Sequence, residues 1–182
     1  SAGASAGASA GASAGASAGA SAGASAGASA GAGSGSSSFF SASFFLLSRA
    51  FFVGSQRWGA VWTGDNSATF DDLALSIRTN IGLGLSGVPF VGCDIGGFNG
   101  EPDSELYVRW MQAASLSPFM RSHTTHDTRD QEPWAYGEES ERRCKAAIER
   151  RYRLLPYLYS ALYKAHQTGL PVIRPLWLEQ PQ

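Results

Sequence analysis

Four apolar runs in the charged part of this chain each lead to a polar side chain that could do chemistry. These side chains are Arg49, Asp65, Asp94 and His123. The spacing is 29 residues from Asp65 to Asp94 and again 29 residues from Asp94 to His123. One strand–helix unit of a (β/α)8 barrel has about this length, and such barrels carry their catalytic groups at the C-terminal ends of the strands. The spacing therefore predicts the rim of a barrel active site.

Asp65 is the first candidate acid, because it closely follows the aromatic residues Trp58 and Trp62. A carboxyl group beside aromatic rings is partly desolvated, and desolvation favours its uncharged form, as a general acid requires. The rings could also stack on a sugar. The stretch 63–66 is equally typical of a simple turn, because Gly, Asp and Asn are turn formers.

Asp94 lies in a second such stretch, CysAspIleGlyGlyPhe at 93–98. Its carboxylate could hold two adjacent hydroxyl groups, and the two glycines allow the backbone to approach a ligand or another loop closely. Phe98 could form an apolar wall beside it. An Asp–Gly turn without function explains the same residues.

The third candidate element consists of cationic and imidazole donors. Arg49, Arg121 and His123 could bind sugar hydroxyls or orient a carboxylate. His123, His126 and Asp127 could instead form a metal cluster, but the residues around them are typical of a loop. We therefore predict no metal site and no cofactor.

The composition divides the chain into two unlike parts. Residues 1–32 are copies of SerAlaGlyAla, GlySerGlySerSerSer follows at 33–38, and no charged residue precedes Arg49. Low-complexity sequence of this kind cannot bury a core, so we expect a disordered tail over 1–38. The alternative is a silk-like stacking module, since the repeat would place Ala on one face of a strand. The net charge of −1 gives no reason to expect a nucleic-acid partner.

The charged part alternates strand-like and helix-like segments, with no membrane-spanning stretch. We expect a buried strand at 39–47, further strands in the runs before Asp65, Asp94 and His123, and a last strand at 172–178. Hydrophobic periodicity predicts three helices, at 70–80, 104–115 and 138–167. Pro156 should kink or split the third helix. Cys93 and Cys144 are interpreted as isolated buried thiols, although a disulfide is open.

The apolar positions predict which face of each helix is buried. The expected stripes are, in order, Leu73, Ile77 and Ile81; Tyr107, Trp110, Met111 and Ala114; and Ile148, Tyr152, Leu155, Tyr159 and Leu162.

Residues 45–179 closely resemble the catalytic domain of glycoside hydrolase family 31, the α-glucosidase family. The resemblance rests on several motifs in the family's order: SerArgAlaPhePheValGlySerGlnArgTrp at 48–58, ValTrpThrGlyAspAsn at 61–66, PheValGlyCysAspIleGlyGlyPhe at 90–98, ProPheMetArgSerHis at 118–123, ArgTyrArgLeuLeuProTyrLeuTyr at 151–159 and GlyLeuProValIleArgPro at 169–175.

The resemblance implies a retaining α-glycosidase on a (β/α)8 barrel, with an α-glucoside as substrate. It implies that Asp65 is the general acid/base after the sixth strand and that Asp94 binds sugar hydroxyls rather than acting as nucleophile. The other roles it implies are sugar binding by Arg49 and His123, pocket walls formed by Trp62 and Phe98, and support of the site by Arg121.

One part of the family pattern is absent. The family's nucleophile is an Asp after the fourth strand, but no carboxylate precedes Asp65 here. We therefore expect an α/β fold comprising about the last four strands of a (β/α)8 barrel at 39–137, then a post-barrel helix and the start of a β segment at 138–182. We expect this chain to be inactive alone, with an N-terminal half-barrel as its missing partner. The alternatives are a silk-like protein with a passenger half-barrel, or a weak carbohydrate-binding remnant.

Overall fold

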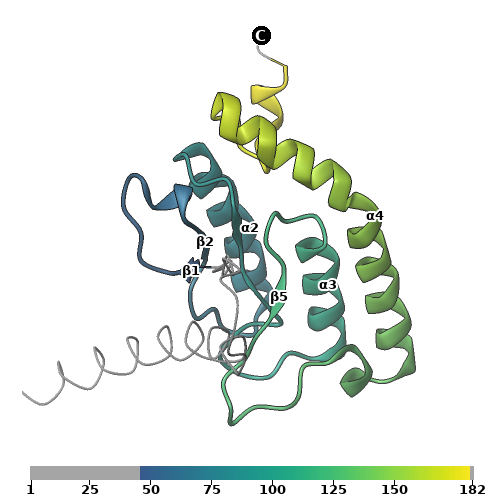
Figure 1. Ribbon diagram of the computed structural model, residues 1–182. Coiled ribbons are helices and arrows are strands. Elements are labelled where there is room, and N and C mark those ends of the chain that lie inside the picture. Colours follow the sequence, from purple (N-terminus) through teal and green to yellow (C-terminus); the bar gives the residue numbers. More distant parts are fainter. Residues whose placement is uncertain (1–45, 181–182) are drawn as a thin grey trace, which may run out of the picture. The chain divides into compact units, whose positions relative to one another are not determined.

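The computed structural model describes residues 46–180 (Figure 1). The expected tail at 1–38 and most of the expected strand at 39–47 lie outside the described residues. Strand β1 (Leu46–Ser48) belongs to a separate unit from the one that begins at Arg49.

The strands of the larger unit are short and parallel. They are β2 (Gly59–Trp62), β3 (Val91–Gly92), β4 (Asp94–Ile95) and β5 (Arg121–Ser122). Strand β2 pairs with β3, placing Trp62 opposite Gly92. Strand β4 pairs with β5, placing Asp94 opposite Arg121. Because the strands are parallel, their C-terminal ends lie toward the same edge, as the spacing of the polar residues predicts.

Two capped helices follow β2 and β4. Helix α2 (Phe70–Leu85) begins where the Thr69 hydroxyl accepts from the Asp72 backbone N–H at 3.1 Å. Helix α3 (Ser104–Ala114) begins where the Asp103 carboxylate accepts from the Leu106 N–H at 2.7 Å. The apolar stripe predicted for α3 is confirmed, since its four members are all buried.

Helix α2 departs from its prediction in length and in face. The glycine-containing segment 82–85 continues the helix instead of ending it. Its buried positions are Leu73, Ser76, Asn80 and Gly84, whereas Ile77 is 44 % exposed. Small side chains on this face let the helix approach its neighbours closely: a Cβ at Gly84 would lie 3.0 Å from the Ile173 carbonyl oxygen.

Helix α4 (Glu138–Thr168) contains Pro156 without being split. Its axis changes direction part-way along its length, so the predicted kink is present (Figure 1). The predicted stripe is wrong, because Tyr152, Leu155 and Tyr159 are exposed. The buried positions are instead small or mid-sized: Ser140, Cys144, Ala147, Leu158 and Ala165. Gly169, at a φ of +77°, ends the helix.

The last strand predicted from the sequence, at 172–178, is also wrong. The structure has a short 3-10 helix, η3 (Leu176–Leu178), in its place. Pro175 precedes this turn with its φ near −72°, and a proline cannot donate to a strand ladder. Two further 3-10 turns, η1 (Ser55–Arg57) and η2 (Pro133–Tyr136), lie in the loops.

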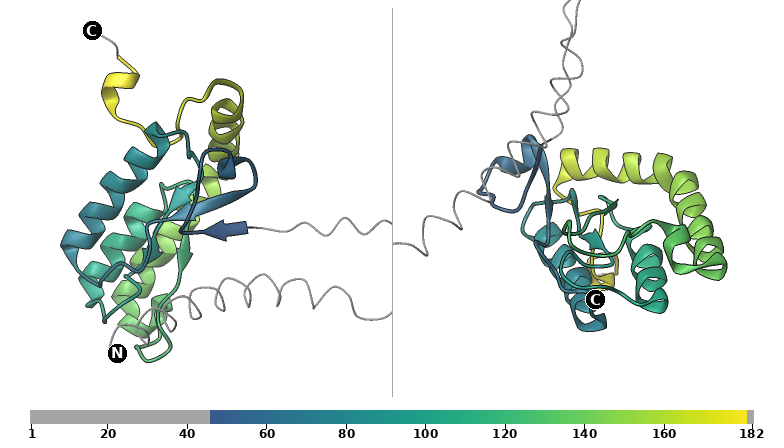
Figure 2. Two further views of the ribbon diagram at one scale, coloured as in Figure 1. Left: turned by 90° about the vertical axis from the view of Figure 1, so that its left-hand side faces the viewer. Right: turned by 90° about the horizontal axis from the view of Figure 1, so that it is seen from below.

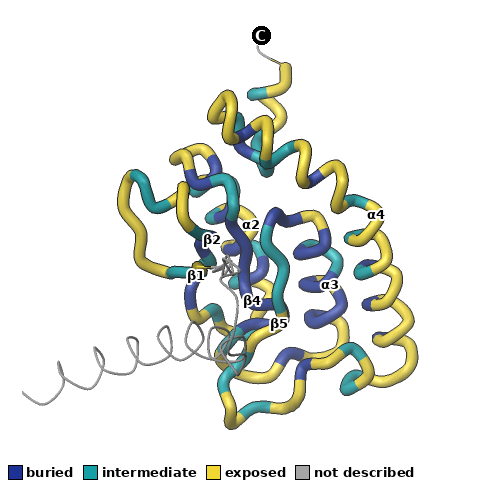
Figure 3. Tube along the Cα trace, viewed as in Figure 1, coloured by how far each residue is buried: buried dark blue, intermediate teal, exposed yellow. Residues whose placement is uncertain are grey.

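The helices form one layer against the short strands. Helix α3 packs against α2, α4 and β4, while α2 packs against β3, and the three helices run side by side (Figure 2). Buried residues gather on β2, β3 and β4 and on α3, and further ones lie on α2 and α4 (Figure 3). Both cysteines are buried free thiols, as predicted, and burial raises the pKa of each to about 11.

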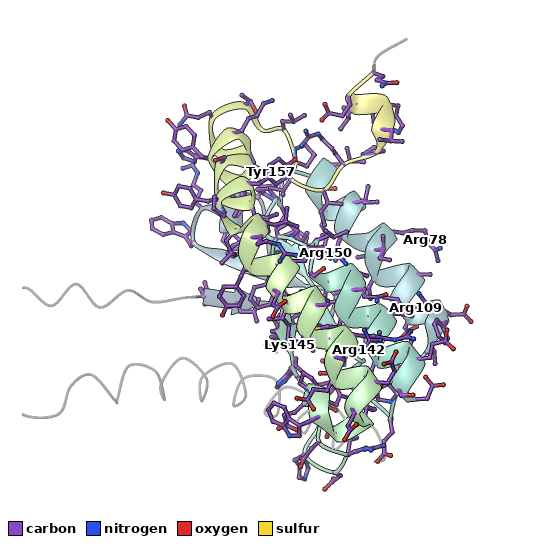
Figure 4. The ribbon with its side chains drawn as sticks, turned by 90° about the vertical axis from the view of Figure 1, so that its right-hand side faces the viewer. Arg78, Arg109, Arg142, Lys145, Arg150 and Tyr157 are labelled. Atoms are coloured by element: carbon purple, nitrogen blue, oxygen red, sulfur yellow. The ribbon has the colours of Figure 1, made fainter. Side chains whose placement is uncertain are left out.

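The opposite surface of the helix layer is charged and faces solvent. Arg78 of α2, Arg109 of α3 and Arg142 of α4 are among the exposed side chains on it (Figure 4). Several of the exposed cations pair with neighbours on their own helix, as Arg109 does with Glu105 at 3.5 Å. Among residues 46–180, no helix is both long and apolar enough to cross a lipid bilayer.

Candidate functional site

Asp94 and Arg121 form the centre of the candidate site. The parallel register of β4 and β5 places them side by side, and the Arg121 Nε donates to the Asp94 Oδ1 at 2.6 Å. The Asp94 side chain is completely buried, whereas that of Arg121 is 25 % exposed. Burial raises the pKa of Asp94 above its ordinary range, and the neighbouring Arg121 opposes that shift. The Asp94 Oδ2 has no hydrogen-bond partner within residues 46–180.

Trp62, the last residue of β2, extends this centre toward the neighbouring strand. The Arg121 guanidinium lies over the Trp62 ring, with its Cζ 5.1 Å from the ring centroid. A cation over an indole face is attracted by the ring quadrupole. Arg121 therefore contacts both the Trp62 ring and the Asp94 carboxylate. Of the two roles considered for an arginine here, this contact corresponds to the orientation of a carboxylate.

Asp65 lies in the loop after β2 and pairs with Arg49. The Arg49 Nη1 is 3.0 Å from the Asp65 Oδ2, and the two side chains are 58 % and 45 % exposed. Gly64 adopts a φ of +91°, and a Cβ there would lie 3.0 Å from the Arg49 Cδ, so this glycine lets the arginine reach Asp65. The aromatic shielding expected for Asp65 stays a prediction: Trp58 is 76 % exposed, and the Trp62 ring lies against the Arg121 guanidinium.

Backbone bonds hold the loop after β2 against the loop after β4. The Phe98 and Asn99 N–H groups both donate to the Asn66 carbonyl, at 2.8 and 3.0 Å. The Asn99 side chain donates to the Asp65 carbonyl at 3.2 Å. Gly97, with a φ of +87°, makes this approach possible, because a Cβ there would lie 2.7 Å from the Ala68 nitrogen. The main chain that bears Asp65 is thus fixed to the main chain that bears Phe98.

His123 follows β5 directly and stacks on Phe98. The two ring centroids are 5.3 Å apart and the rings are inclined by 28°. The Thr125 N–H and the Thr124 hydroxyl both donate to the Phe98 carbonyl, at 3.2 Å. His126 pairs with the adjacent Asp127 at 3.2 Å on the surface instead of joining His123. Over the described range 46–180, no three His, Cys, Asp or Glu side chains gather as a metal would require.

The seven residues proposed from the sequence thus form three contact groups on neighbouring loops. The groups are Arg49 with Asp65, Trp62 with Arg121 and Asp94, and Phe98 with His123. They also interact through charge, since the charges of His123 and Asp65 both act on the Asp94 carboxyl. The arrangement brings side chains that are able to hydrogen-bond hydroxyl groups near the accessible carboxylate of Asp65.

Two residues of the site were missed by sequence reasoning. Gln131 is buried beneath the loop after β4, and Tyr107 donates its hydroxyl proton to the Gln131 carbonyl. Tyr107 was assigned only to the apolar face of α3, and its ring does stack on Tyr136 at 4.4 Å. A single glutamine in a polar loop carries no sequence signal, so only the packing identifies Gln131.

A cavity of about 610 Å³ opens beside β5. Arg121, Ser122 and His123 line one part of it, and its remaining wall is largely apolar. The apolar lining comes from β4, α3, α4 and the approach to β5: Ile95, Met111, Met120, Ile148 and Leu155. In the described part of the chain, β5 pairs only with β4, so its other edge is open.

Residues 23–161 match the model of the glycosyl hydrolases family 31 TIM-barrel domain. This chain belongs to glycoside hydrolase family 31. It is 55 % identical over 137 residues to a probable glucan 1,3-alpha-glucosidase of Oryza sativa subsp. japonica and 53 % identical over 137 residues to the neutral alpha-glucosidase C of Homo sapiens. Each alignment covers 75 % of this chain and 15 % of the relative.

Solved structures agree with this assignment. The Tris-bound glucosidase II alpha subunit superimposes with a TM-score of 0.73 at 46 % identity, over 75 % of this chain and 15 % of that one. A family 31 alpha-glucosidase from Bacteroides thetaiotaomicron gives a TM-score of 0.72 at 43 % identity, over 75 % of this chain and 23 % of that one. The α/β fold with parallel strands predicted from the sequence is therefore that of a glycoside hydrolase barrel domain, and the chain spans less than a quarter of each of these relatives.

Proposed function

We propose that this chain carries the acid/base half of a retaining α-glucosidase active site. In this assignment Asp65 protonates the leaving glycosidic oxygen and later takes a proton from water. The observation that carries the proposal is the accessible Asp65–Arg49 pair in the loop after β2, together with buried Asp94 of the parallel strand β4, in a family 31 domain. Arg49 lies within hydrogen-bonding distance of Asp65 and is suited to hold the carboxylate in place.

The remaining residues are assigned to the sugar. The unpaired Oδ2 of buried Asp94 offers an acceptor for a sugar hydroxyl, while Arg121 keeps the carboxylate oriented through Oδ1. The stacked Phe98 and His123 rings form one wall, with His123 also able to bond a hydroxyl, and Trp62 forms another. We propose α-glucosides as the substrate class, because the relatives are named for α-glucosidase activity.

We further propose that the 182-residue chain does not turn over an α-glucoside by itself. A retaining mechanism needs a nucleophilic carboxylate about 5–5.5 Å from the acid/base. Asp94 is buried and already paired with Arg121, and no Asp or Glu precedes Asp65 in this sequence. Without a nucleophile, no covalent glycosyl intermediate forms.

The partner that would supply the nucleophilic carboxylate is an N-terminal half-barrel. We propose that β1, β2, β3 with β4, and β5 correspond to the last four strands of the eight-stranded barrel, within a half-barrel at 39–137 followed by the post-barrel segment at 138–182. The open edge of β5 and the largely apolar cavity beside it offer a surface for the first strands. The short share of each relative that the chain spans supports the same partner.

A second candidate function is weak carbohydrate binding. It is favoured by the Asp94–Arg121–Trp62 group, which is in place in this chain without any partner. Because half of the pocket walls would be absent, we expect a weak affinity for glucose or maltose.

The test uses the purified chain with a chromogenic α-glucoside. We expect no release of chromophore above the buffer blank, and turnover that disappears in Asp65→Asn would contradict the proposed inactivity. Titration calorimetry with maltose then separates the two functions. Heat that saturates in the unchanged chain and is lost in Asp94→Asn would support binding without catalysis.

A further inference from the structure

We propose that Gln131 is a positioning residue of the sugar site. Its side chain fastens the loop after β5 to the loop after β4 and so holds His123 against Phe98. The inference deepens the proposed function, because it concerns the residues assigned there to the sugar, and its test is made without any sugar.

The burial of Gln131 is the first observation. The residue is 6 % exposed, although Asp130 and Glu132 on either side of it are exposed. Leaving a buried carboxamide group unsatisfied costs free energy, so a hydrogen bond made by such a group contributes to holding it in place. The Gln131 Nε2 makes one such bond, whereas its Oε1 has no hydrogen-bond partner within residues 46–180.

The acceptor of the Gln131 Nε2 belongs to the glycine pair of the loop after β4. The Gln131 Nε2 donates to the Gly97 carbonyl at 3.3 Å. A Cβ at Gly96 would lie 2.7 Å from the Gln131 Oε1, and Gly96 has a φ of +88°. The absence of a side chain at Gly96 thus leaves space for the Gln131 carboxamide beneath the loop. Gly97 has a separate role, because it allows the close approach to Ala68.

The main chain of Gln131 is held from the other side. Its carbonyl accepts from the Ser122 hydroxyl at 3.2 Å and from the Tyr107 hydroxyl. Ser122 is the last residue of β5 and directly precedes His123, whereas Tyr107 belongs to α3. Gln131 therefore connects the end of β5 and the body of α3 to the loop that carries Phe98.

These contacts close a ring of interactions around the two stacked side chains. Thr124 and Thr125 hold the Phe98 carbonyl immediately after His123, and Gln131 holds the Gly97 carbonyl immediately before Phe98. Two adjacent peptide carbonyls are thus fixed from the same loop. Removing the Gln131 donor leaves the Gly97–Phe98 peptide held, within the described residues, only through the Phe98 N–H bond to the Asn66 carbonyl, and this should loosen the stacking on His123.

The test follows the imidazole Cε1–H signal of His123 by nuclear magnetic resonance, since the chain has three histidines. The Phe98 ring shifts this signal through its ring current, and Phe98→Leu gives the unstacked position. In folded Gln131→Met, which keeps the volume, and Gln131→Glu, which removes the donor, we expect the signal to move toward that position. His126 and His166 should keep their signals.

The matched control is Gln167→Glu on the exposed surface of α4, which should leave the His123 signal in place. An unchanged His123 signal in a folded Gln131 variant would overturn the inference, even if that variant melts at a lower temperature. If neither Gln131 variant folds, the inference is tested on the unchanged chain. Its Gln131 amide protons are expected to exchange slowly and to show Overhauser contacts with Gly97, and fast exchange without such contacts overturns the inference. If experiments showed that Asp65 is not the acid/base, the result of this test would still stand, because it uses no substrate.

Discussion

The balance between burial and pairing at Asp94 governs the chemistry of the candidate site at the residue scale. Burial penalises the charged carboxylate, and the single bond to Arg121 at 2.6 Å together with the nearby positive charge offsets part of that penalty. The free Oδ2 is what a sugar hydroxyl would use. A bound sugar hydroxyl would therefore stabilise the Asp94 carboxylate beyond what the folded chain alone provides.

We expect removal of Arg121 to be more damaging than removal of the Asp94 charge. Arg121→Met leaves a buried carboxylate without its cation and should lower the free energy of unfolding by about 3 kcal/mol. Asp94→Asn keeps the shape and removes the charge that burial penalises, so its loss should be about 1 kcal/mol. Urea unfolding of both variants measures the difference, and equal losses would contradict the ion-pair interpretation.

The same carboxyl should give the chain a measurable pH dependence. Its pKa in the folded chain lies above its ordinary value of 3.8, so above that pH the folded state binds more protons than the unfolded state. The free energy of unfolding should therefore fall as the pH rises from about 4 through the folded pKa. In Asp94→Asn this contribution is absent, and the fall should be shallower. A fall of the same size in both proteins would show that another group causes it.

At the scale of elements, the helix starts were predictable and two of the buried faces were not. The caps at Thr69 and Asp103 follow from local chemistry, because a side-chain oxygen before a helix satisfies a free N–H. The stripe on α3 was also predictable, since its buried residues include the large Tyr107 and Trp110. Hydrophobic periodicity predicts the buried face of a helix mainly from its large apolar side chains. The prediction therefore fails for a helix that packs closely against its neighbours through small side chains.

Helix α4 shows why the rest could not be predicted from periodicity. It contacts α3 through residues such as Cys144 and Ala147, while Tyr152 and Leu155 line the cavity beside β5. Their apolar character reflects a surface that the chain leaves open, not the core it forms. The positions of the candidate site residues followed from strand spacing, but their pairing depends on register, which a sequence with strands of two to four residues does not specify.

The glycines of the loop after β4 test the loop packing directly. Gly97→Ala adds a Cβ 2.7 Å from the Ala68 nitrogen at a φ of +87°, whereas Gly87→Ala adds one in open space at a φ of +85°. The backbone penalty of about 1 kcal/mol is common to both substitutions. We expect Gly97→Ala to lose about 1–3 kcal/mol more, because the neighbouring backbone must move. Thermal and urea unfolding measure both, and matching losses would show that the loops are not held together tightly.

At the scale of the whole molecule, large apolar side chains remain exposed within residues 46–180. Phe52 is 77 % exposed, Tyr152 is 69 % exposed, and the edge of β5 away from β4 is unpaired in the described chain. An exposed edge with apolar surroundings favours pairing with a further strand. The open surface is therefore consistent with the complementing half-barrel proposed above, which would join the residues assigned as acid and as sugar-binding groups.

Complementation makes this argument testable through Asp65. We expect the chain mixed with a separately expressed first half-barrel of a relative to release chromophore from an α-glucoside, although neither part does so alone. Asp65→Asn should lower the restored rate by at least about 10²-fold, because general acid–base catalysis contributes 10²–10⁴-fold. It should change stability by less than about 1 kcal/mol, because the Arg49 pair is solvent-exposed.

The matched control is Asp71→Asn, the same substitution in the first turn of α2, where the side chain is exposed and outside the candidate site. It should leave the restored rate within about twofold, since exposed substitutions of this kind have small effects. Equal rates for Asp65→Asn and the unchanged chain would remove Asp65 from the acid/base role. Restored activity that survives Asp65→Asn but requires Asp94 would instead transfer that role to the buried carboxyl, and the ion pair with Arg121 would then have to open during catalysis.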